Sequence, residues 1–198
     1  MGITPQQLDA IQQRLAGKET GASTVSSSYD NGQVILGIDP SLRGTGYGVI
    51  DTTKTNPFAV LQGTIKCPAK WPISRCLVEI SNILESVIKQ TNPTVAAIEG
   101  LFYAQNAKTA LVMGQARGAA LTIVAKSGLD VFEIAPRKVK QAIVGYGAAQ
   151  KDAVAKMIKT RLALSETPSP DEADALAIAL TFAQSSGSPI PDKAIKHI

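Results

Sequence analysis

Residues 34–51 read VILGIDPSLRGTGYGVID, and the rest of the chain is organised around this stretch. Two short apolar runs rich in Val and Ile flank a centre of Pro, Ser and Gly, which predicts a buried strand, a tight turn and a second strand. Asp39 ends the first strand, where the core opens to solvent. An ionised carboxylate there is costly unless a cation meets it, although an Asp at this position can also simply cap the turn.

Composition narrows the class of protein. The chain has 198 residues with 44% hydrophobic content, enough for one well-buried domain, and it contains no apolar run near the roughly 18 residues that a membrane span needs. With only Cys67, Cys76 and His197, it offers neither a disulfide framework nor a Cys/His zinc site, and a His-dependent triad is not expected. Its chemistry must use carboxylates, lysines, hydroxyls or a bound cofactor. The scarcity of cysteine predicts a cytoplasmic location.

Three regions are predicted along the chain. Residues 1–32 form an N-terminal extension, with a short amphipathic helix followed by a flexible linker rich in Gly, Ser and Thr. This extension lacks the features of a secretory signal or transit peptide, so it is either a dispensable tail or a helix that docks a partner. Residues 33–185 form the folded domain, and residues 186–198 a C-terminal tail.

Apolar periodicity predicts an α/β domain. Strands are expected at 58–67, 94–99 and 130–135, and helices at 73–90, 107–126, 136–144 and 150–164. The helix at 107–126 contains Gly114, Gly118 and many alanines. Small residues allow another backbone to approach closely, so this helix is expected to make a tight contact with a helix or a second subunit.

Carboxylates recur where elements begin or end. Glu99 closes an apolar strand, as Asp39 does. Residues 169–172 form a capping box that opens the last predicted helix, and the helix dipole explains Asp171 in its first turn. Asp174 lies further along, in a run of Ala, Leu and Ile that is otherwise typical of a buried core. Three residues apart, Asp171 and Asp174 project from the same helix face.

These acids predict a metal site. If the strands that end at Asp39 and Glu99 are near neighbours and the last helix packs over them, four carboxylates converge. Oxygen ligands without His or Cys select Mg²⁺ or Mn²⁺. Two such ions, roughly 3.5–4 Å apart, are the usual apparatus for phosphodiester hydrolysis.

The charge distribution favours a nucleic-acid substrate. Residues 136–164 contain seven basic side chains against the single acid Asp152: Arg137, Lys138, Lys140, Lys151, Lys156, Lys159 and Arg161. A basic face beside an acidic metal site suits a phosphate backbone. The same pattern is also found on an ordinary solvated helix face.

Several short motifs follow one another in order over residues 34–184: Ile38-Asp39-Pro40, Thr45-Gly46-Tyr47-Gly48, Ile98-Glu99 with Phe102, Gly114-Gln115-Ala116-Arg117-Gly118, Val139-Lys140-Gln141, Gly145-Tyr146-Gly147 with Lys151, and Ala173-Asp174-Ala175-Leu176-Ala177. Together these motifs resemble the RuvC family of bacterial Holliday junction resolvases. The resemblance implies a ribonuclease H-like fold, with a mixed five-stranded sheet flanked by helices on both sides. It also implies a homodimer that nicks four-way DNA junctions symmetrically, uses two Mg²⁺ ions per active site and works with a branch-migration motor of the RuvA and RuvB type.

The resemblance assigns roles residue by residue. The family's catalytic metal ligands fall on Asp39, Glu99, Asp171 and Asp174. Its DNA-contacting lysines fall on Lys140 and Lys151, with Arg137 beside them in the basic segment, and its aromatic wedge falls on Phe102, followed by Tyr103. The alternative for Phe102 is a hydrophobic cap on the helix that follows.

Two positions depart from the family pattern, and rival functions stay open. Ser41 stands where the family commonly has Gly, and Gly100 stands where a longer side chain is usual. The strand and turn around Asp39 also resemble the phosphate loop of actin-like ATPases, but the chain has no room for their second lobe. A catalytically silent junction-binding protein and a ribonuclease H-type nuclease are the remaining alternatives.

Overall fold

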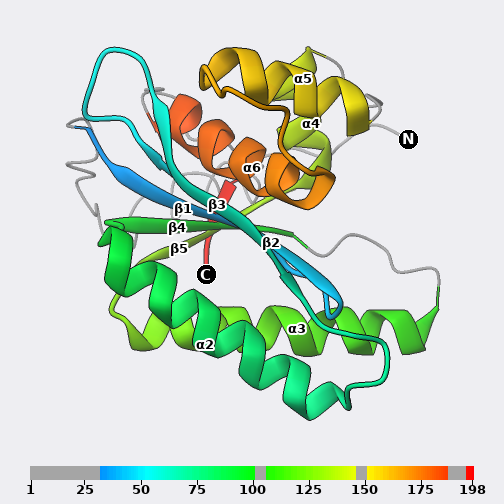
Figure 1. Cartoon of the computed structure of the whole chain (residues 1–198). Helices are drawn as coiled ribbons and strands as arrows, with labels where there is room; N and C mark the ends of the chain where they lie inside the picture. The colour runs from blue at the N-terminus through cyan, green and yellow to red at the C-terminus, as the bar shows by residue number, and fades with distance from the viewer. Residues whose placement is uncertain (1–31, 101–105, 146–150, 187–194) are drawn as a thin grey trace, which may run out of the picture.

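A six-stranded mixed sheet forms the middle layer of the molecule (Figure 1). The structure is a computed structural model that describes residues 32–100, 106–145, 151–186 and 195–198. The strands are β1 (Val34–Asp39), β2 (Gly44–Asp51), β3 (Phe58–Lys66), β4 (Val95–Glu99), β5 (Val131–Ile134) and β6 (Ile195–His197). Their order is β3-β2-β1-β4-β5-β6, in which β4 runs parallel to both β1 and β5 and the other pairs are antiparallel.

Helices cover both faces of this sheet. α2 (Ile73–Thr91) and α3 (Ala107–Lys126) lie on one face, and α4 (Pro136–Val144), α5 (Lys151–Arg161) and α6 (Pro170–Ser186) lie on the other (Figure 1). The predicted mixed sheet between two helical layers is confirmed, and the predicted bounds of α3 and α4 agree with the structure. No helix in the described ranges is long and apolar enough to cross a membrane.

The sheet has six strands, where the sequence predicted five. The extra strand, β6, comes from residues 186–198, which were predicted to be a tail. It pairs with β5, where Phe132 lies opposite His197 and their ring centroids are 4.9 Å apart. A strand of three residues is too short to show an alternating pattern, so no local sequence pattern indicated β6.

Each face of the sheet has its own core. On one side Leu36 and Ile38 pack with the buried residues of α2 and α3. On the other side Ile35 packs with the buried residues of α4, α5 and α6. Successive side chains of a strand point to opposite faces, so the apolar run of β1 fills both cores. The predicted helix and linker in residues 1–31 lie outside the described residues.

Candidate metal centre and nucleic-acid interface

Two of the four predicted metal ligands end neighbouring parallel strands. Asp39 is the last residue of β1 and Glu99 the last residue of β4. In the parallel pairing of these strands Ile38 lies opposite Ile98, so Asp39 and Glu99 occupy the next position on each strand. Both are half-buried. The sequence analysis made the adjacency of these strands a condition for a shared site, and the structure meets that condition by placing both acids at one edge of the sheet.

Strand alternation assigns both acids to the same face. Asp39 follows Ile35 by four residues and Glu99 follows Val95 by four, and Ile35 and Val95 both belong to the core under α4, α5 and α6. Because side chains on a strand repeat every two residues, Asp39 and Glu99 face the α6 side.

α6 crosses the sheet at this edge in close backbone contact. Gly46 of β2 pairs with Asp39, and a Cβ atom on Gly46 would lie 2.1 Å from the carbonyl oxygen of Asp171. A Cβ atom on Gly37 of β1 would lie equally close, 2.1 Å, to the carbonyl oxygen of Ala175. Only glycine permits such an approach. The first turns of α6 therefore lie directly over β2 and β1, next to Asp39.

The start of α6 follows the predicted capping box in part. The Glu172 carboxylate accepts a hydrogen bond from the backbone N–H of Ser169 at 2.8 Å, as the box requires. The Ser169 hydroxyl lies 3.3 Å from the hydroxyl of Thr64 on β3, which ties the helix start to the sheet. Asp171 and Asp174 are both half-buried, whereas the sequence predicted a buried Asp174. Asp174 is therefore only partly shielded from solvent.

The chemistry of these donors fits a hard divalent cation, because all four supply carboxylate oxygens. Within the described ranges, no group of three or more His, Cys, Asp or Glu side chains is arranged to hold a metal ion. Carboxylates brought together repel one another until a cation joins them. The structure thus brings β1, β4 and α6 together, and the convergence of Asp39, Glu99, Asp171 and Asp174 on metal stays a prediction.

The turn after Asp39 accommodates Ser41 without strain. The Thr45 hydroxyl accepts a hydrogen bond from the Ser41 N–H at 3.2 Å and donates one to the Ser41 carbonyl. In the described chain, positive φ angles occur only at Asn92, Ala163, Gly128 and Gly145, so this turn needs no left-handed residue. The departure from the family's glycine is therefore tolerated.

Arg43 fastens the same turn to the start of α2. Its guanidinium donates to the carbonyls of Pro68 and Trp71 at 2.7 and 3.1 Å, and to the Cys76 sulfur at 3.1 Å. The Cys67 N–H in turn donates to the Arg43 carbonyl. Burial, together with the neighbouring Cys76 thiol, raises the pKa of Cys67 to about 11. Cys67 is therefore a protonated core residue at neutral pH.

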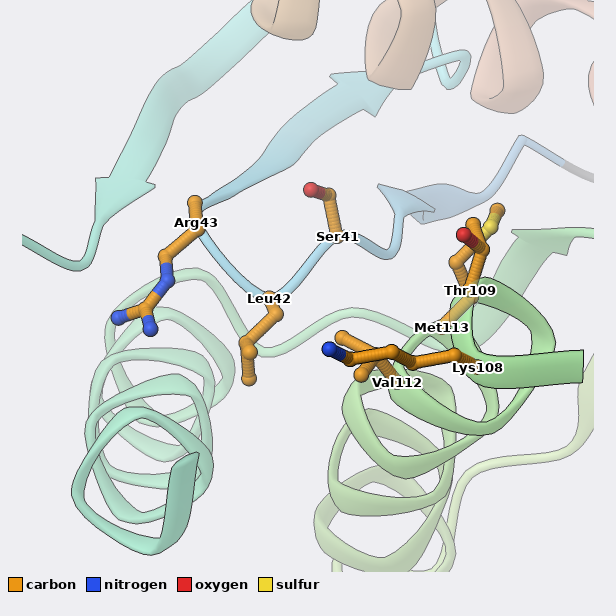
Figure 2. Close-up of a pocket in the computed structure, with 7 residues that line it drawn as sticks. All are labelled: Ser41, Leu42, Arg43, Lys108, Thr109, Val112 and Met113. Atoms are coloured by element: carbon orange, nitrogen blue, oxygen red, sulfur yellow. The ribbon is translucent and has the colours of Figure 1, made fainter. Parts of the chain in front are cut away.

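A pocket of about 330 Å³ opens beside this turn. Figure 2 shows Leu42 of the turn opposite the Lys108 side chain of α3, with the Ser41 hydroxyl directed away from α3. The Asn106 side chain caps α3 by accepting a hydrogen bond from the Thr109 N–H at 2.9 Å. The pocket thus lies between the turn that follows β1 and the start of α3, close to Asp39 at the end of β1.

The predicted DNA-binding residues are only partly described. α4 begins two residues after Ile134, which lies opposite Glu99, so Arg137 and Lys140 belong to a helix that starts at the acidic edge. Arg137 is exposed and Lys140 half-buried. Lys151 is the first residue of α5. Phe102 and Tyr103 lie outside the described residues.

Two arginine contacts had no counterpart in the sequence analysis. The Arg161 guanidinium donates to the Ala142 carbonyl at 3.2 Å, so this member of the basic segment holds α5 to α4. Arg117 of α3 forms an ion pair with Glu133 of β5 and donates to the backbone carbonyl of Glu99. The motif around Arg117 supported the family resemblance, but spacing gave no sign of its partners.

Comparison with known proteins gives consistent matches. Residues 35–182 match the family described as "Crossover junction endodeoxyribonuclease RuvC". The RuvC of Heliobacterium modesticaldum is 45% identical over 153 residues, which cover 77% of this chain and 94% of that protein. The RuvC of Caldicellulosiruptor saccharolyticus is 42% identical over 156 residues, covering 78% and 94%.

Solved structures agree with these matches. Thermus thermophilus RuvC in complex with Holliday junction substrate aligns with a TM-score of 0.71 and 33% identity, covering 76% of this chain and 93% of that chain. The yeast mitochondrial Holliday junction resolvase Ydc2 aligns with a TM-score of 0.56 and 12% identity over 81% of this chain and 83% of that chain. The second likeness concerns the fold alone.

The mixed sheet between two helical layers, together with the match to Thermus thermophilus RuvC, defines a nuclease of the ribonuclease H-like class. Within that class, the chain belongs to the RuvC family of crossover junction endodeoxyribonucleases. The predicted family, fold class and enzyme class are confirmed.

Proposed function

We propose that this chain resolves four-way DNA junctions by paired symmetric nicking, using two Mg²⁺ ions in each active site. One observation carries the proposal: Asp39 and Glu99 end adjacent parallel strands on the face that the first turns of α6 cross. Family membership supports the junction as substrate. Mn²⁺ is expected to replace Mg²⁺, since both prefer oxygen ligands.

The position of β1 suggests how the acids share the metal. β1 lies between β2, under Asp171, and β4, which ends at Glu99. Asp39 would therefore bridge both ions, while Glu99 holds one and the Asp171/Asp174 pair holds the other. Bound Mg²⁺ supplies an activated water and charge stabilisation at the leaving oxygen. The half-burial of all four acids limits the water that competes for these positions.

The basic helices would hold the DNA backbone. Arg137 and Lys140 on α4 and Lys151 at the start of α5 would contact phosphates, which positions the scissile strand over the acids. Phe102, with Tyr103 beside it, would insert against unstacked bases at the junction centre, as the family resemblance implies. Unstacking costs a few kcal/mol per step, and contacts with the opened junction offset this cost.

Paired nicks need two active sites, so we propose a homodimer. α3 offers a suitable contact surface: a Cβ atom on Gly114 or Gly118 would meet nothing within 4 Å, and the Leu111 side chain on the same helix is 65% exposed. Small residues permit close approach of a second helix. A branch-migration motor of the RuvA and RuvB type is the expected partner on the same junction. Free Cys67 and Cys76 are compatible with a cytoplasmic location.

Cleavage of a labelled, mobile four-way junction tests the proposal. The assay is run with and without Mg²⁺, with a linear duplex and an RNA/DNA hybrid as parallel substrates. Paired symmetric nicks in the junction alone are expected, and the same gel gives the preferred sequence. Cutting of the hybrid would indicate a ribonuclease H-type enzyme instead, and tight junction binding without cleavage would indicate a silent junction-binding protein.

A further inference from the structure

Arg117 makes an uncommon set of contacts for a charged residue. It lies in the middle of α3, and only 8% of the residue is exposed. Its Nη1 atom donates to the backbone carbonyl of Glu99 at 3.2 Å, and its Nη2 atom donates to the Glu133 carboxylate. A buried guanidinium is costly unless its donors are satisfied and its charge is paired. Glu133 compensates the positive charge of Arg117, and the main-chain carbonyl of Glu99 accepts a hydrogen bond from the guanidinium.

Glu133 is built into the sheet beside the acidic strand. It lies opposite Ile98 in the parallel pairing of β4 and β5, and Ile98 belongs to the core under α2 and α3. Glu133 therefore faces the opposite side of the sheet from the Glu99 side chain. Gly100 leaves room for it: a Cβ atom there would lie 3.1 Å from Cγ of Glu133 and 3.4 Å from its Oε1. A Cβ atom at position 100 would therefore require the Glu133 side chain to shift by a few tenths of an ångström.

The peptide group that follows Glu99 is held at both ends. Its carbonyl, from Glu99, accepts from Arg117 at 3.2 Å, and its N–H, from Gly100, donates to the Ile134 carbonyl at 2.9 Å. Two bonds in different directions fix the plane of a peptide. Fixing that plane fixes ψ of Glu99 and restricts the direction of its Cα–Cβ bond.

We propose that Arg117, held by Glu133, is a positioning residue for Glu99: from the far face of the sheet, it fixes the main chain from which the Glu99 carboxylate projects. This inference rests on the proposed function, in which Glu99 binds metal. The ion pair lets Arg117 do this with its own charge compensated by Glu133. Outer-shell groups of this kind set how tightly a ligand presents its oxygens to the ion.

Arg117→Lys is the most informative variant. It keeps the positive charge, but an ammonium group cannot reproduce the forked donors that serve Glu99 and Glu133 together. Arg161→Lys is the matched control, since Arg161 also donates to a backbone carbonyl at 3.2 Å, between α5 and α4. Arg117→Gln removes the charge altogether. The Glu133 side chain it would leave behind is 34% exposed and can hydrate, so this variant is also expected to fold. Melting curves verify folding for all three.

Three readouts separate positioning from general structure. For Arg117→Lys, the Mg²⁺ concentration for half-maximal junction cleavage is expected to rise about tenfold, and Mn²⁺ affinity of the DNA-free protein, measured by calorimetry, to fall by about the same factor. Arg117→Gln should show larger changes in both. Junction affinity in EDTA should stay at the wild-type value for both Arg117 variants. Arg117 is only 8% exposed and contacts Glu99 and Glu133, so it is not expected to bind DNA phosphates. Arg161→Lys should leave both metal measurements at the wild-type values, because Arg161 contacts Ala142 rather than Glu99.

Other outcomes overturn the inference. A folded Arg117→Lys protein with wild-type Mg²⁺ dependence and wild-type Mn²⁺ affinity would show that Glu99 needs no such support. Weakened junction binding in EDTA would make Arg117 part of the DNA interface instead. If the wild-type chain cleaved no junction at all, the proposed function would fail, and the calorimetric Mn²⁺ affinities of wild type and Arg117→Lys would still decide the role of Arg117.

Discussion

α6 meets the sheet through its backbone beside Asp39, whereas α2 meets the other face through large side chains. On the α6 face, Gly37 and Gly46 bring strand and helix main chains into direct contact. On the other face, Leu36 and Ile38 of the sheet pack with Ile80 and Leu84 of α2, all of them fully buried. The same sheet thus supports α6 through main-chain contact and α2 through packed side chains.

The difference shows how the fold divides its tasks. Side chains on a single helix turn can join those of strand ends only when the helix lies close to the sheet, and glycines supply that proximity beside Asp39. The α2 and α3 face carries stability and, in our proposal, the subunit contact and the support of Glu99. Changes on the α6 face should therefore affect chemistry first, and changes on the other face should affect stability first.

Asp39→Asn should have the largest effect. Loss of the bridging charge removes Lewis-acid stabilisation worth several kcal/mol, so cleavage should fall by about a thousandfold or more. Junction binding should persist, because removing a negative charge from a DNA-facing site does not weaken phosphate attraction. Gel shifts in EDTA and cleavage assays in Mg²⁺ measure the two quantities.

Glu85→Gln is the matched control for Asp39→Asn. It makes the same carboxylate-to-amide change on the exposed side of α2, where Glu85 pairs with Lys89 at 2.8 Å. Cleavage should stay at the wild-type rate. Loss of junction binding by Asp39→Asn would count against the metal role and would make Asp39 a structural residue of the turn.

Gly46→Ala should have the next largest effect. The new Cβ atom would lie 2.1 Å from the Asp171 carbonyl oxygen and 2.7 Å from its carbon, so the start of α6 must move away from β2. A displacement of about 1 Å can cost about a hundredfold in rate, and overpacking costs about 1–3 kcal/mol of stability. Single-turnover cleavage and urea unfolding measure both. Wild-type cleavage by this variant would show that close contact of α6 with β2 is not needed.

Much of the fold followed from local patterns. The apolar spacing that predicted helices at 107–126 and 136–144 gave the observed bounds of α3 and α4. Acids that end two apolar strands raised the possibility of a shared edge, and the structure supplied the parallel pairing of β1 and β4 that brings their carboxyl ends to the same side. β6 could not be predicted in this way, since its three residues gain their structure only by pairing with β5.

The site was less accessible to sequence reasoning. Asp39, Glu99, Asp171 and Asp174 stood out because acids are rare beside core residues. The contact between Arg117 and Glu133 joins a helix to a strand, so no local period reveals it. The room that Gly100 leaves for Glu133 is likewise a tertiary property. Sequence thus indicated candidate residues for the chemistry, and the fold was needed to indicate the residues that we propose support them.

Leu84→Ala tests the other side of the comparison. Leu84 is fully buried between α2 and the sheet, so its truncation should cost about 2–5 kcal/mol of unfolding free energy. The Mg²⁺ concentration for half-maximal cleavage should not change, because the α6 contacts remain intact. Urea unfolding and a Mg²⁺ titration at a temperature where the variant is folded give the two values. A shifted Mg²⁺ dependence would mean that the packing of α2, and not only the contacts of Arg117, supports the metal ligands.

Lys140→Ala should give the smallest change, and it separates charge from geometry. If Lys140 on α4 contacts a phosphate, the slope of log affinity against log salt should become shallower by roughly one unit, with Mg²⁺ dependence unchanged.

Lys89→Ala is the control, since it removes the same charge from an exposed site on α2 that pairs with Glu85. The control should keep the wild-type slope, because α2 lies on the face away from α4 and α6. An unchanged slope for Lys140→Ala would remove this residue from the DNA interface. Equal changes in both variants would mean that the whole charge of the protein, rather than the basic helix beside the acids, attracts the junction.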